Sequence, residues 1–182
     1  MKYNIIYADP PWLYDNRKDC DPKMGGITYP VMELEEIAAL PVQSISANDC
    51  SLFLWATMPK LKEALYVIEK WGFTYTTCAF TWVKLNPSGE GIYSGLGHWT
   101  NGNAELCLFA KRGAPKRLNK NVKQIQIYPR GRHSQKPPEI RGEILKLVGD
   151  LPRIELFARQ KTDGWDAWGN EVLSDIDLLE TK

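Results

Sequence analysis

Two consecutive prolines directly after the first strand-like run constrain the fold of this chain more than any other feature. Residues 3–8 read Tyr-Asn-Ile-Ile-Tyr-Ala, and residues 9–12 read Asp-Pro-Pro-Trp. Proline fixes φ and has no N–H group to give to a β-ladder, so the strand must end at Asp9. In open α/β sheets, ligands bind at the carboxyl ends of the strands. We therefore expect Asp9 to lie at a ligand-binding edge.

The Asp-Pro-Pro-Trp segment combines three kinds of group that suit a planar ligand. Asp9 supplies a carboxylate, and the two prolines leave the carbonyl groups of Asp9 and Pro10 rigid, pointing outward and free to accept hydrogen bonds. Trp12 adds a flat aromatic face. These groups together favour a planar base that carries an exocyclic NH2 group. The alternative is an ordinary loop with a packed tryptophan.

Strand-like and helix-like segments alternate along the rest of the chain. The apolar run 51–56 is typical of a buried strand, Thr57 and Pro59 predict the start of a helix, and Gly72 predicts its end. Further strands are predicted at residues 73–84, 105–110, 124–128, 153–158 and 165–168, and further helices at residues 33–40 and 138–147. This alternation predicts an α/β fold with a doubly wound, mostly parallel sheet, in a single domain over residues 1–182.

The charge of the chain is balanced overall but unevenly distributed. The formal net charge is +1, yet residues 111–132 carry eight Lys or Arg and no Asp or Glu, which leaves the remainder net acidic. A basic stretch on an acidic body is typical of proteins that bind polyanions. Because this stretch lies between the strand 105–110 and Lys136, we expect it to flank the ligand-binding cleft. A solvated loop that only promotes solubility is the alternative.

Cysteine and histidine usage argues against a metal centre. The four cysteines stand far apart without a Cys-x-x-Cys pair, and the chain has only two histidines, so we expect no metal and reduced thiols. The first residues enter a strand directly, without a signal peptide, and no apolar run approaches the length of a membrane span. We therefore expect a cytoplasmic protein without membrane contact. Monomer and homodimer both remain open.

A segment before one of the predicted helices indicates an anion site. Residues 133–139 read His-Ser-Gln-Lys-Pro-Pro-Glu, and the backbone N–H groups at the helix start together with Lys136 would hold a carboxylate or a phosphate. A routine helix-capping sequence is the alternative.

The last strands carry the pattern of a nucleoside pocket. A strand ends near Arg159, a turn with Lys161 and Thr162 follows, and a second strand leads to Asn170 and Glu171. An acidic residue about 15–20 positions beyond the first turn commonly binds ribose hydroxyls. The glycine-rich dinucleotide fingerprint is absent, which excludes a standard NAD site.

Taken together, these segments resemble the adenine-N6 methyltransferase family named after the seventy-kilodalton subunit of the mRNA-methylating enzyme. The matching segments occur in the family's order and are residues 9–12, 53–55, 82–84, 97–99, 103–105, 133–139, 155–159 and 168–170. The resemblance implies a Rossmann-like, S-adenosylmethionine-dependent methyltransferase fold. It also implies circular permutation, in which the catalytic motif precedes the cofactor strand, and methylation of the N6 amine of adenine.

The resemblance also implies roles for individual residues. Asp9 and the Pro10 carbonyl would accept hydrogen bonds from N6, Pro11 would complete the catalytic motif, and Trp12 would stack on the base. The residues implied to surround S-adenosylmethionine are Asp9, Lys136, Arg159, Lys161, Thr162, Asn170 and Glu171, with Lys136 at the methionine carboxylate. The residues implied to line the substrate side are Tyr29, Trp99, Asn101 and Glu105.

Three alternatives bear on the substrate. A small chain without an added RNA-binding domain favours DNA over RNA. An inactive scaffold that only presents nucleic acid is expected to lose the acidic or the aromatic residue of the motif, and both Asp9 and Trp12 are present. Methylation of cytosine N4 or of a protein glutamine is disfavoured, because family relatives with that chemistry tend to carry Ser or Asn in place of Asp9.

Overall fold

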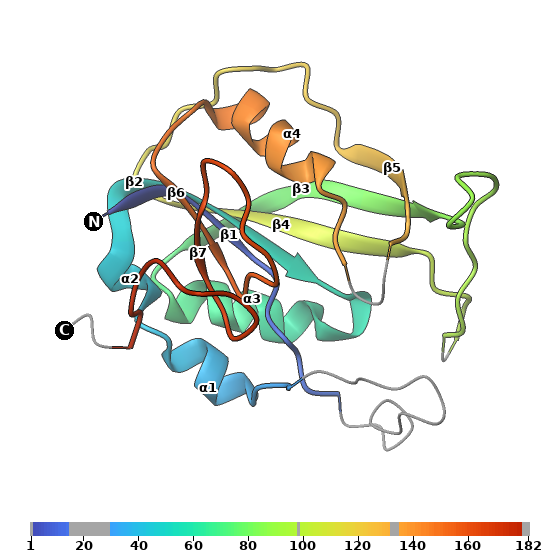
Figure 1. Cartoon of the computed structure of the whole chain (residues 1–182), viewed down its shortest axis with the longest axis horizontal. Helices are drawn as coiled ribbons and strands as arrows, with labels where there is room; N and C mark the ends of the chain where they lie inside the picture. The colour runs from blue at the N-terminus through green and yellow to red at the C-terminus, as the bar shows by residue number, and fades with distance from the viewer. Residues whose placement is uncertain (1, 15–29, 98, 132–134, 180–182) are drawn as a thin grey trace.

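The computed structural model describes residues 2–14, 30–97, 99–131 and 135–179 of the chain. In this part of the chain, one sheet is formed by β1 (Tyr3–Ala8), β2 (Ser46–Ala56), β3 (Thr74–Leu85), β4 (Ala104–Arg112), β5 (Ile125–Pro129), β6 (Arg153–Leu156) and β7 (Asp166–Trp168). The strand order is β5-β3-β4-β2-β1-β6-β7. The helices are α1 (Leu34–Ala39), α2 (Val42–Ile45), α3 (Leu61–Lys70) and α4 (Glu139–Val148). Helices α1 and α3 lie on one side of the sheet and α4 lies on the other (Figure 1).

The strand directions confirm the prediction of a mostly parallel α/β sheet. β1 is parallel to β2 and β6, β6 is parallel to β7, and β3 is parallel to β5. Only β4 runs antiparallel to both of its neighbours, β2 and β3, a reversal that the sequence pattern did not predict. As a consequence, β4 begins at the edge of the sheet where the parallel strands end.

Alternating side chains bury both faces of the central strands. On β1, Ile6 packs in the cluster that contains the buried residues of α1 and α3, whereas Tyr7 packs in the cluster that contains those of α4. On β2, Leu54 and Trp55 divide in the same way. Successive side chains of a strand point to opposite faces, so a strand that is covered on both sides is apolar throughout. This double cover holds the strand ends, and the residues that follow them, in fixed positions.

Helix α3 ends as predicted but begins differently. Gly72 follows its last turn with a φ of 79°, a left-handed conformation that favours glycine. At the other end, a 3-10 turn η2 (Met58–Lys60) precedes the helix, and the side chain of Thr57 makes no capping hydrogen bond. Thr57 is nevertheless the N-cap residue of this turn, as predicted, although its side chain does not cap it. Its hydroxyl lies 2.7 Å from the hydroxyl of Tyr14 instead.

The prediction that the basic residues 111–132 flank the ligand-binding cleft is largely wrong. Because β4 is antiparallel, Arg112 lies at the edge opposite to Asp9, where its guanidinium donates to the carbonyl of Gln43 at 3.1 Å. The chain then passes over α4 and returns with β5 to the edge that contains Asp9 (Figure 1). Of the described part of this stretch, only the residues around Arg130 reach that edge, since Arg130 donates its backbone N–H to the last residue of β3.

Candidate functional site

A cavity of about 280 Å³ opens at the carboxyl edge of the sheet. Asp9 follows β1, Thr57 follows β2, Arg159 lies beyond β6, and Asn170 follows β7, and all four line the cavity. Glu105 joins them from the start of β4 because that strand is reversed. The volume is near the lower end of the range for small-molecule pockets. Residues that are far apart in the sequence thus meet where parallel strands end, as the sequence predicted for Asp9.

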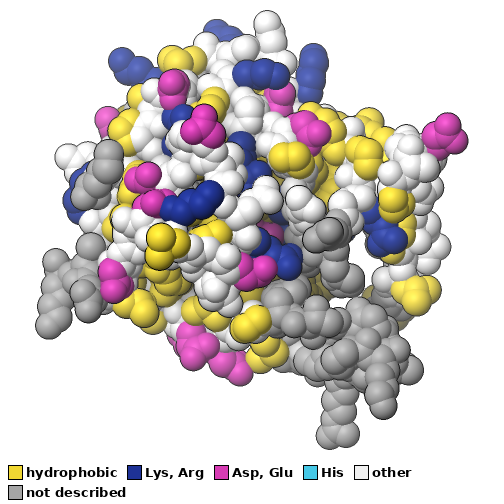
Figure 2. Space-filling model, in the orientation of Figure 1, with side chains coloured by type: hydrophobic (Ala, Val, Ile, Leu, Met, Phe, Trp, Pro, Cys, Tyr) yellow, Lys and Arg dark blue, Asp and Glu magenta, His cyan; other side chains and the backbone are white. Residues whose placement is uncertain are grey.

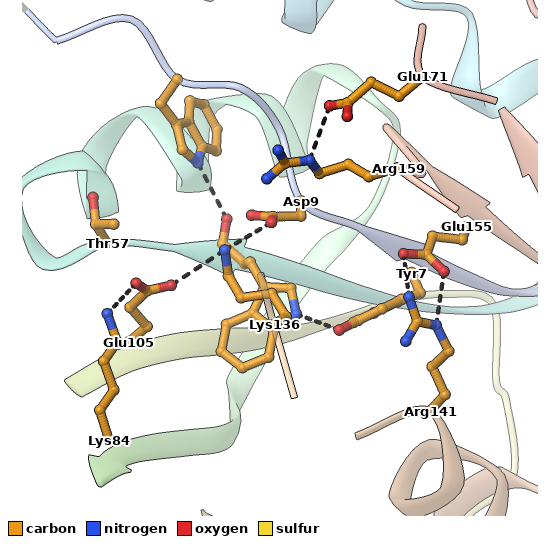
Figure 3. A network of polar contacts seen from close by, with 12 residues as sticks. Tyr7, Asp9, Thr57, Lys84, Glu105, Lys136, Arg141, Glu155, Arg159 and Glu171 are labelled. Carbon is orange, nitrogen blue, oxygen red and sulfur yellow. Dashed lines mark hydrogen bonds and ion pairs between the residues drawn. The ribbon is translucent and has the colours of Figure 1, made fainter. Parts of the chain in front are cut away.

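A chain of ion pairs crosses the cavity wall (Figure 3). The Nζ atom of Lys136 lies 2.7 Å from Oδ2 of Asp9 and 3.3 Å from Oε2 of Glu105. Glu105 is also paired with Lys84, whose Nζ lies 2.5 Å from Oε1. Asp9 is the most exposed of the four, with 28% of its side chain accessible, so its carboxylate reaches the cavity while Lys136 fixes its orientation.

The two carboxylates of this chain have pKa values shifted in opposite directions. Burial raises the pKa of Asp9 above its usual value, although Lys136 opposes the rise, and the charge of Glu105 adds to it. Burial acts in the same direction on Glu105, but Lys136 and Lys84 outweigh it, so the pKa of Glu105 is lowered. The difference follows from the number of cations, one beside Asp9 and two beside Glu105. Burial works against the charge of Lys136, but its two acidic neighbours prevail and raise its pKa.

The Pro-Pro segment is less open than the sequence indicated. The Pro10 carbonyl already accepts the backbone N–H of Trp12 at 2.9 Å, so it is only partly free to accept from a ligand. A carbonyl oxygen has two lone pairs, and one acceptor site therefore remains for a ligand. Trp12 lines the cavity, although only 5% of its surface is exposed, and its indole N–H donates to the Trp55 carbonyl at 3.3 Å. Stacking of Trp12 on a base stays a prediction.

The ends of β6 and β7 form the other side of the cavity. The Nε atom of Arg159 lies 2.9 Å from Oε1 of Glu171, and both side chains line the cavity with Asn170 (Figure 3). Gly169 permits the two strand ends to approach closely, since a Cβ atom at this position would lie 2.3 Å from the Ala158 carbonyl oxygen. This close backbone approach explains why glycine stands between Trp168 and Asn170.

Several predicted site residues lie outside the cavity. Lys161 is in the turn between β6 and β7, where it pairs with Asp175, and the Thr162 carbonyl accepts the Trp165 N–H at 3.0 Å. Neither Lys161 nor Thr162 lines the cavity. Trp99 and Asn101 are exposed on the loop between β3 and β4 and do not line it either. Tyr29 lies outside the described residues.

Other residues of the site were not predicted. Tyr14, Thr57 and Phe157 line the cavity, and Lys84 supports it through Glu105. A signal existed for Thr57, since the first polar residue after a buried strand lies at the carboxyl edge of the sheet. No sequence pattern singles out Tyr14, which is placed by its hydroxyl contact with Thr57.

A buried ion pair connects the site to the body of the sheet. The guanidinium of Arg141, in α4, donates two hydrogen bonds of 2.7 Å to the carboxylate of Glu155, in β6 (Figure 3). The same guanidinium lies 5.5 Å from the ring centre of Tyr7 in β1. These contacts fix the start of α4, and with it the position of Lys136 just before the helix.

The described residues contain no group of His, Cys, Asp and Glu side chains arranged to hold a metal ion. No helix in the described ranges is long and apolar enough to cross a membrane. Cys50, Cys78 and Cys107 are free thiols. The polar side chains of the cavity wall include carboxylates, a lysine, an arginine, an asparagine and the hydroxyls of Tyr14 and Thr57.

Comparison with known proteins gives consistent matches over nearly the whole chain. The family model described as MT-A70 matches residues 3–171. The type II methyltransferase M.MunI of Mycoplasma sp is 37% identical, over 94% of this chain and 78% of that protein. The N(6)-adenosine-methyltransferase MT-A70-like protein of Drosophila melanogaster is 32% identical over 94% of this chain, and the N(6)-adenine-specific methyltransferase METTL4 of Homo sapiens is 30% identical over 94%. The matches cover only 27% and 38% of these two animal proteins.

Proposed function

This chain belongs to the MT-A70 family of S-adenosylmethionine-dependent adenine-N6 methyltransferases, and we propose that it methylates the N6 amine of adenine in DNA. The observation that carries the proposal is the position of Asp9. Its carboxylate lies at the cavity wall, partly exposed, directly before the Pro10 carbonyl and held by Lys136. Two acceptors on consecutive residues match the two hydrogens of an exocyclic amine.

The arrangement supports a mechanism based on alignment. The N6 lone pair of adenine is delocalised into the ring and is a poor nucleophile. Hydrogen bonds from both N6 hydrogens to Asp9 and to the Pro10 carbonyl favour a pyramidal nitrogen, whose lone pair can then point at the methyl donor. Most of the rate gain would come from this orientation and from fixed charges at the reacting nitrogen. Lys136 keeps Asp9 ionised and therefore able to accept.

The proton balance requires no strong base. When bound, S-adenosylmethionine would supply the methyl group to N6, and its sulfur would keep the electron pair of the broken bond and leave as a neutral thioether. N6 becomes acidic only at that stage, and Asp9, with its raised pKa, can take the released proton and pass it to water. A carboxylate whose pKa is raised suits brief proton acceptance better than an ordinary surface aspartate does.

The cavity wall fits the cofactor that the family uses. S-adenosylmethionine supplies an activated methyl group, and it carries a carboxylate at one end and a nucleoside at the other. Lys136 offers a cation for the carboxylate, whereas Asn170 and Glu171 offer an amide and a carboxylate for ribose hydroxyls. We propose these three residues as cofactor contacts, with Arg159 orienting Glu171.

DNA is favoured over RNA by the relatives themselves. The match covers 78% of the Mycoplasma protein, which is named a type II methyltransferase. It covers only 27% of the fly protein, which is named an N(6)-adenosine-methyltransferase. If the target adenine lies in a duplex, it must leave the base stack before Asp9 can reach it. Trp12, which lines the cavity, then offers a flat face for the base.

Two broader proposals accompany this one. Residues 1–182 are proposed to form a single methyltransferase domain, supported by one sheet whose strands extend from Tyr3 to Trp168. The protein is proposed to act in the cytoplasm, where free thiols such as those of Cys50 and Cys107 stay reduced.

The function is tested by incubating the protein with labelled S-adenosylmethionine and either DNA or RNA, followed by nucleoside analysis. We expect N6-methyldeoxyadenosine from DNA and no product with Asp9→Ala. Product from RNA alone would overturn the choice of substrate. Absence of product from both, with intact binding of nucleic acid, would instead identify a scaffold that presents nucleic acid.

A further inference from the structure

The described part of the stretch 111–132 contains cations that no carboxylate neutralises. Elsewhere, eight Lys or Arg side chains form ion pairs, which are Lys60, Lys84, Lys136, Arg141, Lys146, Arg153, Arg159 and Lys161. Between β4 and β5, by contrast, Lys116, Arg117, Lys120 and Lys123 are all exposed, and none of them pairs with a carboxylate of the described residues. We call residues 113–124 the basic crossover.

The backbone of the basic crossover is anchored to the body of the protein at several points. Ala114 donates its N–H to Oδ1 of Asp49 at 2.8 Å, and Leu118 donates to the Leu147 carbonyl of α4 at 2.8 Å. At the far end, the side chain of Gln124 donates to the Cys78 carbonyl at 2.7 Å. Val122 packs against the apolar cluster that contains α4. The crossover therefore presents its cations from a fixed support and not from a loose loop.

Three acidic side chains near the crossover already have partners. On α4, Glu143 is paired with Lys146, and just beyond the helix Asp150 is paired with Arg153. Asp49 accepts the backbone N–H of Ala114. Figure 2 shows Lys and Arg side chains standing out from the upper rim of the molecule, where the crossover passes over α4 in Figure 1. The positive charge of this rim is consequently available to a ligand.

The crossover leads toward the candidate site. It starts beyond Arg112, at the edge opposite to Asp9, and β5 carries the chain back to Arg130 at the edge where the cavity opens. α4 has 10 residues and is thus about 15 Å long, which corresponds to about four or five base pairs of duplex. The crossover that passes over α4 therefore faces a length comparable with that of several successive phosphates.

We propose that the basic crossover is a second contact surface, which binds phosphates of the DNA that flanks the target adenine on the α4 side of the cavity. The proposal rests on the proposed function, since a polyanionic substrate is what gives these cations a role. It also explains why positive charge is concentrated on one connection of an otherwise acidic chain. Such contacts carry little sequence information but increase affinity and fix the direction in which the duplex lies.

The experiment compares two variants that each lose three positive charges. Lys116, Lys120 and Lys123 are replaced by Gln in one variant, and the exposed Lys2, Lys62 and Lys70 are replaced by Gln in the matched control. Binding of fluorescent random-sequence duplexes of 10 and 30 base pairs is titrated at several salt concentrations. Plasmid methylation at saturating cofactor supplies kcat and KM, and thermal melting verifies that both variants remain folded.

We expect the crossover variant to lose about 0.9 units of log–log salt slope for each duplex phosphate contact removed. The loss should be larger for the 30-base-pair duplex than for the short one, and KM should rise while kcat is unchanged. Parallel salt slopes in wild type and crossover variant, or equal losses in both variants, would overturn the proposal. Binding is measured without methyl transfer, so a wild-type protein that shows the salt-dependent binding but makes no N6-methyladenine contradicts the proposed function and not the surface.

Discussion

Lys136 and Asp9 form an ion pair of 2.7 Å although 127 positions separate them in the sequence. Lys136 comes just before α4 and Asp9 follows β1, so the pair joins the helix layer to the carboxyl edge of the sheet. The same lysine contacts Glu105 at the start of β4. One cation therefore sets both the orientation and the ionisation of the carboxylate that we assign to the target amine.

Asp9→Ala should abolish formation of N6-methyladenine while the fold and cofactor affinity stay largely intact. Loss of one aligned polar contact at the reacting atom typically costs about 10²–10³-fold in kcat. Asp9→Asn is the matched control: it keeps the size of the side chain and one acceptor oxygen but removes the charge, and we expect intermediate activity. Single-turnover assays with saturating cofactor measure the effect, and turnover of Asp9→Ala at the wild-type rate would remove Asp9 from the mechanism.

The acid side of the pH profile of kcat should shift to lower pH in one variant and to higher pH in another. Activity requires ionised Asp9, so kcat falls as the pH drops through the raised pKa of this carboxyl. Glu105→Gln removes a negative charge that raises the pKa of Asp9, and the acid side should move to lower pH. Lys136→Met removes the positive charge that lowers this pKa, and the acid side should move to higher pH. Shifts of both variants in the same direction would show that another group controls the acid side.

Substitutions around the cavity should distinguish residues that contact the cofactor from residues that do not. Asn170→Ala should weaken S-adenosylmethionine binding by about 0.5–1.5 kcal/mol, and Lys136→Ala by about 1.5–3 kcal/mol, since a bond to a charged group is the stronger one. Thr162→Ala and Lys161→Ala are the controls, because neither residue lines the cavity. Calorimetry in the absence of nucleic acid measures all four. A Thr162→Ala effect as large as that of Asn170→Ala would place the nucleoside outside this cavity.

Gly169→Ala should destabilise the protein, whereas Gly142→Ala should stabilise it. A Cβ atom at residue 169 would lie 2.3 Å from a backbone oxygen and 2.8 Å from a backbone nitrogen of Ala158, which cannot easily move, so we expect a loss of about 1–3 kcal/mol in the free energy of unfolding. Gly142 lies inside α4 with nothing within 4 Å of its Cβ position, and alanine there should add about 0.5–1 kcal/mol. Urea unfolding measures the free energy of unfolding of each variant, which should fall for Gly169→Ala and rise for Gly142→Ala.

Local sequence patterns predicted the elements of the fold well because strand and helix periodicities are local. The run 3–8, the apolar run 51–56 and the helix that starts near Pro138 all correspond to observed elements. The direction of β4 is not determined by a local pattern. The loop of residues 86–103 is long enough for β4 to run either antiparallel or parallel to β3. The predicted position of the basic stretch failed for this reason, since it depended on the edge at which β4 ends.

The candidate site was predictable where a residue follows a strand and unpredictable where a tertiary contact places it. Asp9, Arg159 and Asn170 follow strands, and the cavity contains them. Lys161 differs because its turn lies beyond the strand ends, and an ion pair with Asp175 holds it there. Tyr14 enters the wall through a contact with a residue 43 positions away, which no local pattern encodes.

The position of β1 between β2 and β6 has a consequence for the order of assembly during synthesis. β1 is made before the other strands of the sheet, but it pairs with residues 153–156 on one side. The parts of the cavity wall that contain Arg159 and Asn170 follow later still. Pairings between distant segments form slowly because a long loop must close first. Until that closure, one edge of β1 is exposed and available to a chaperone or to another nascent chain. The cavity around Asp9 can therefore be completed only after the residues up to Glu171 have been synthesised.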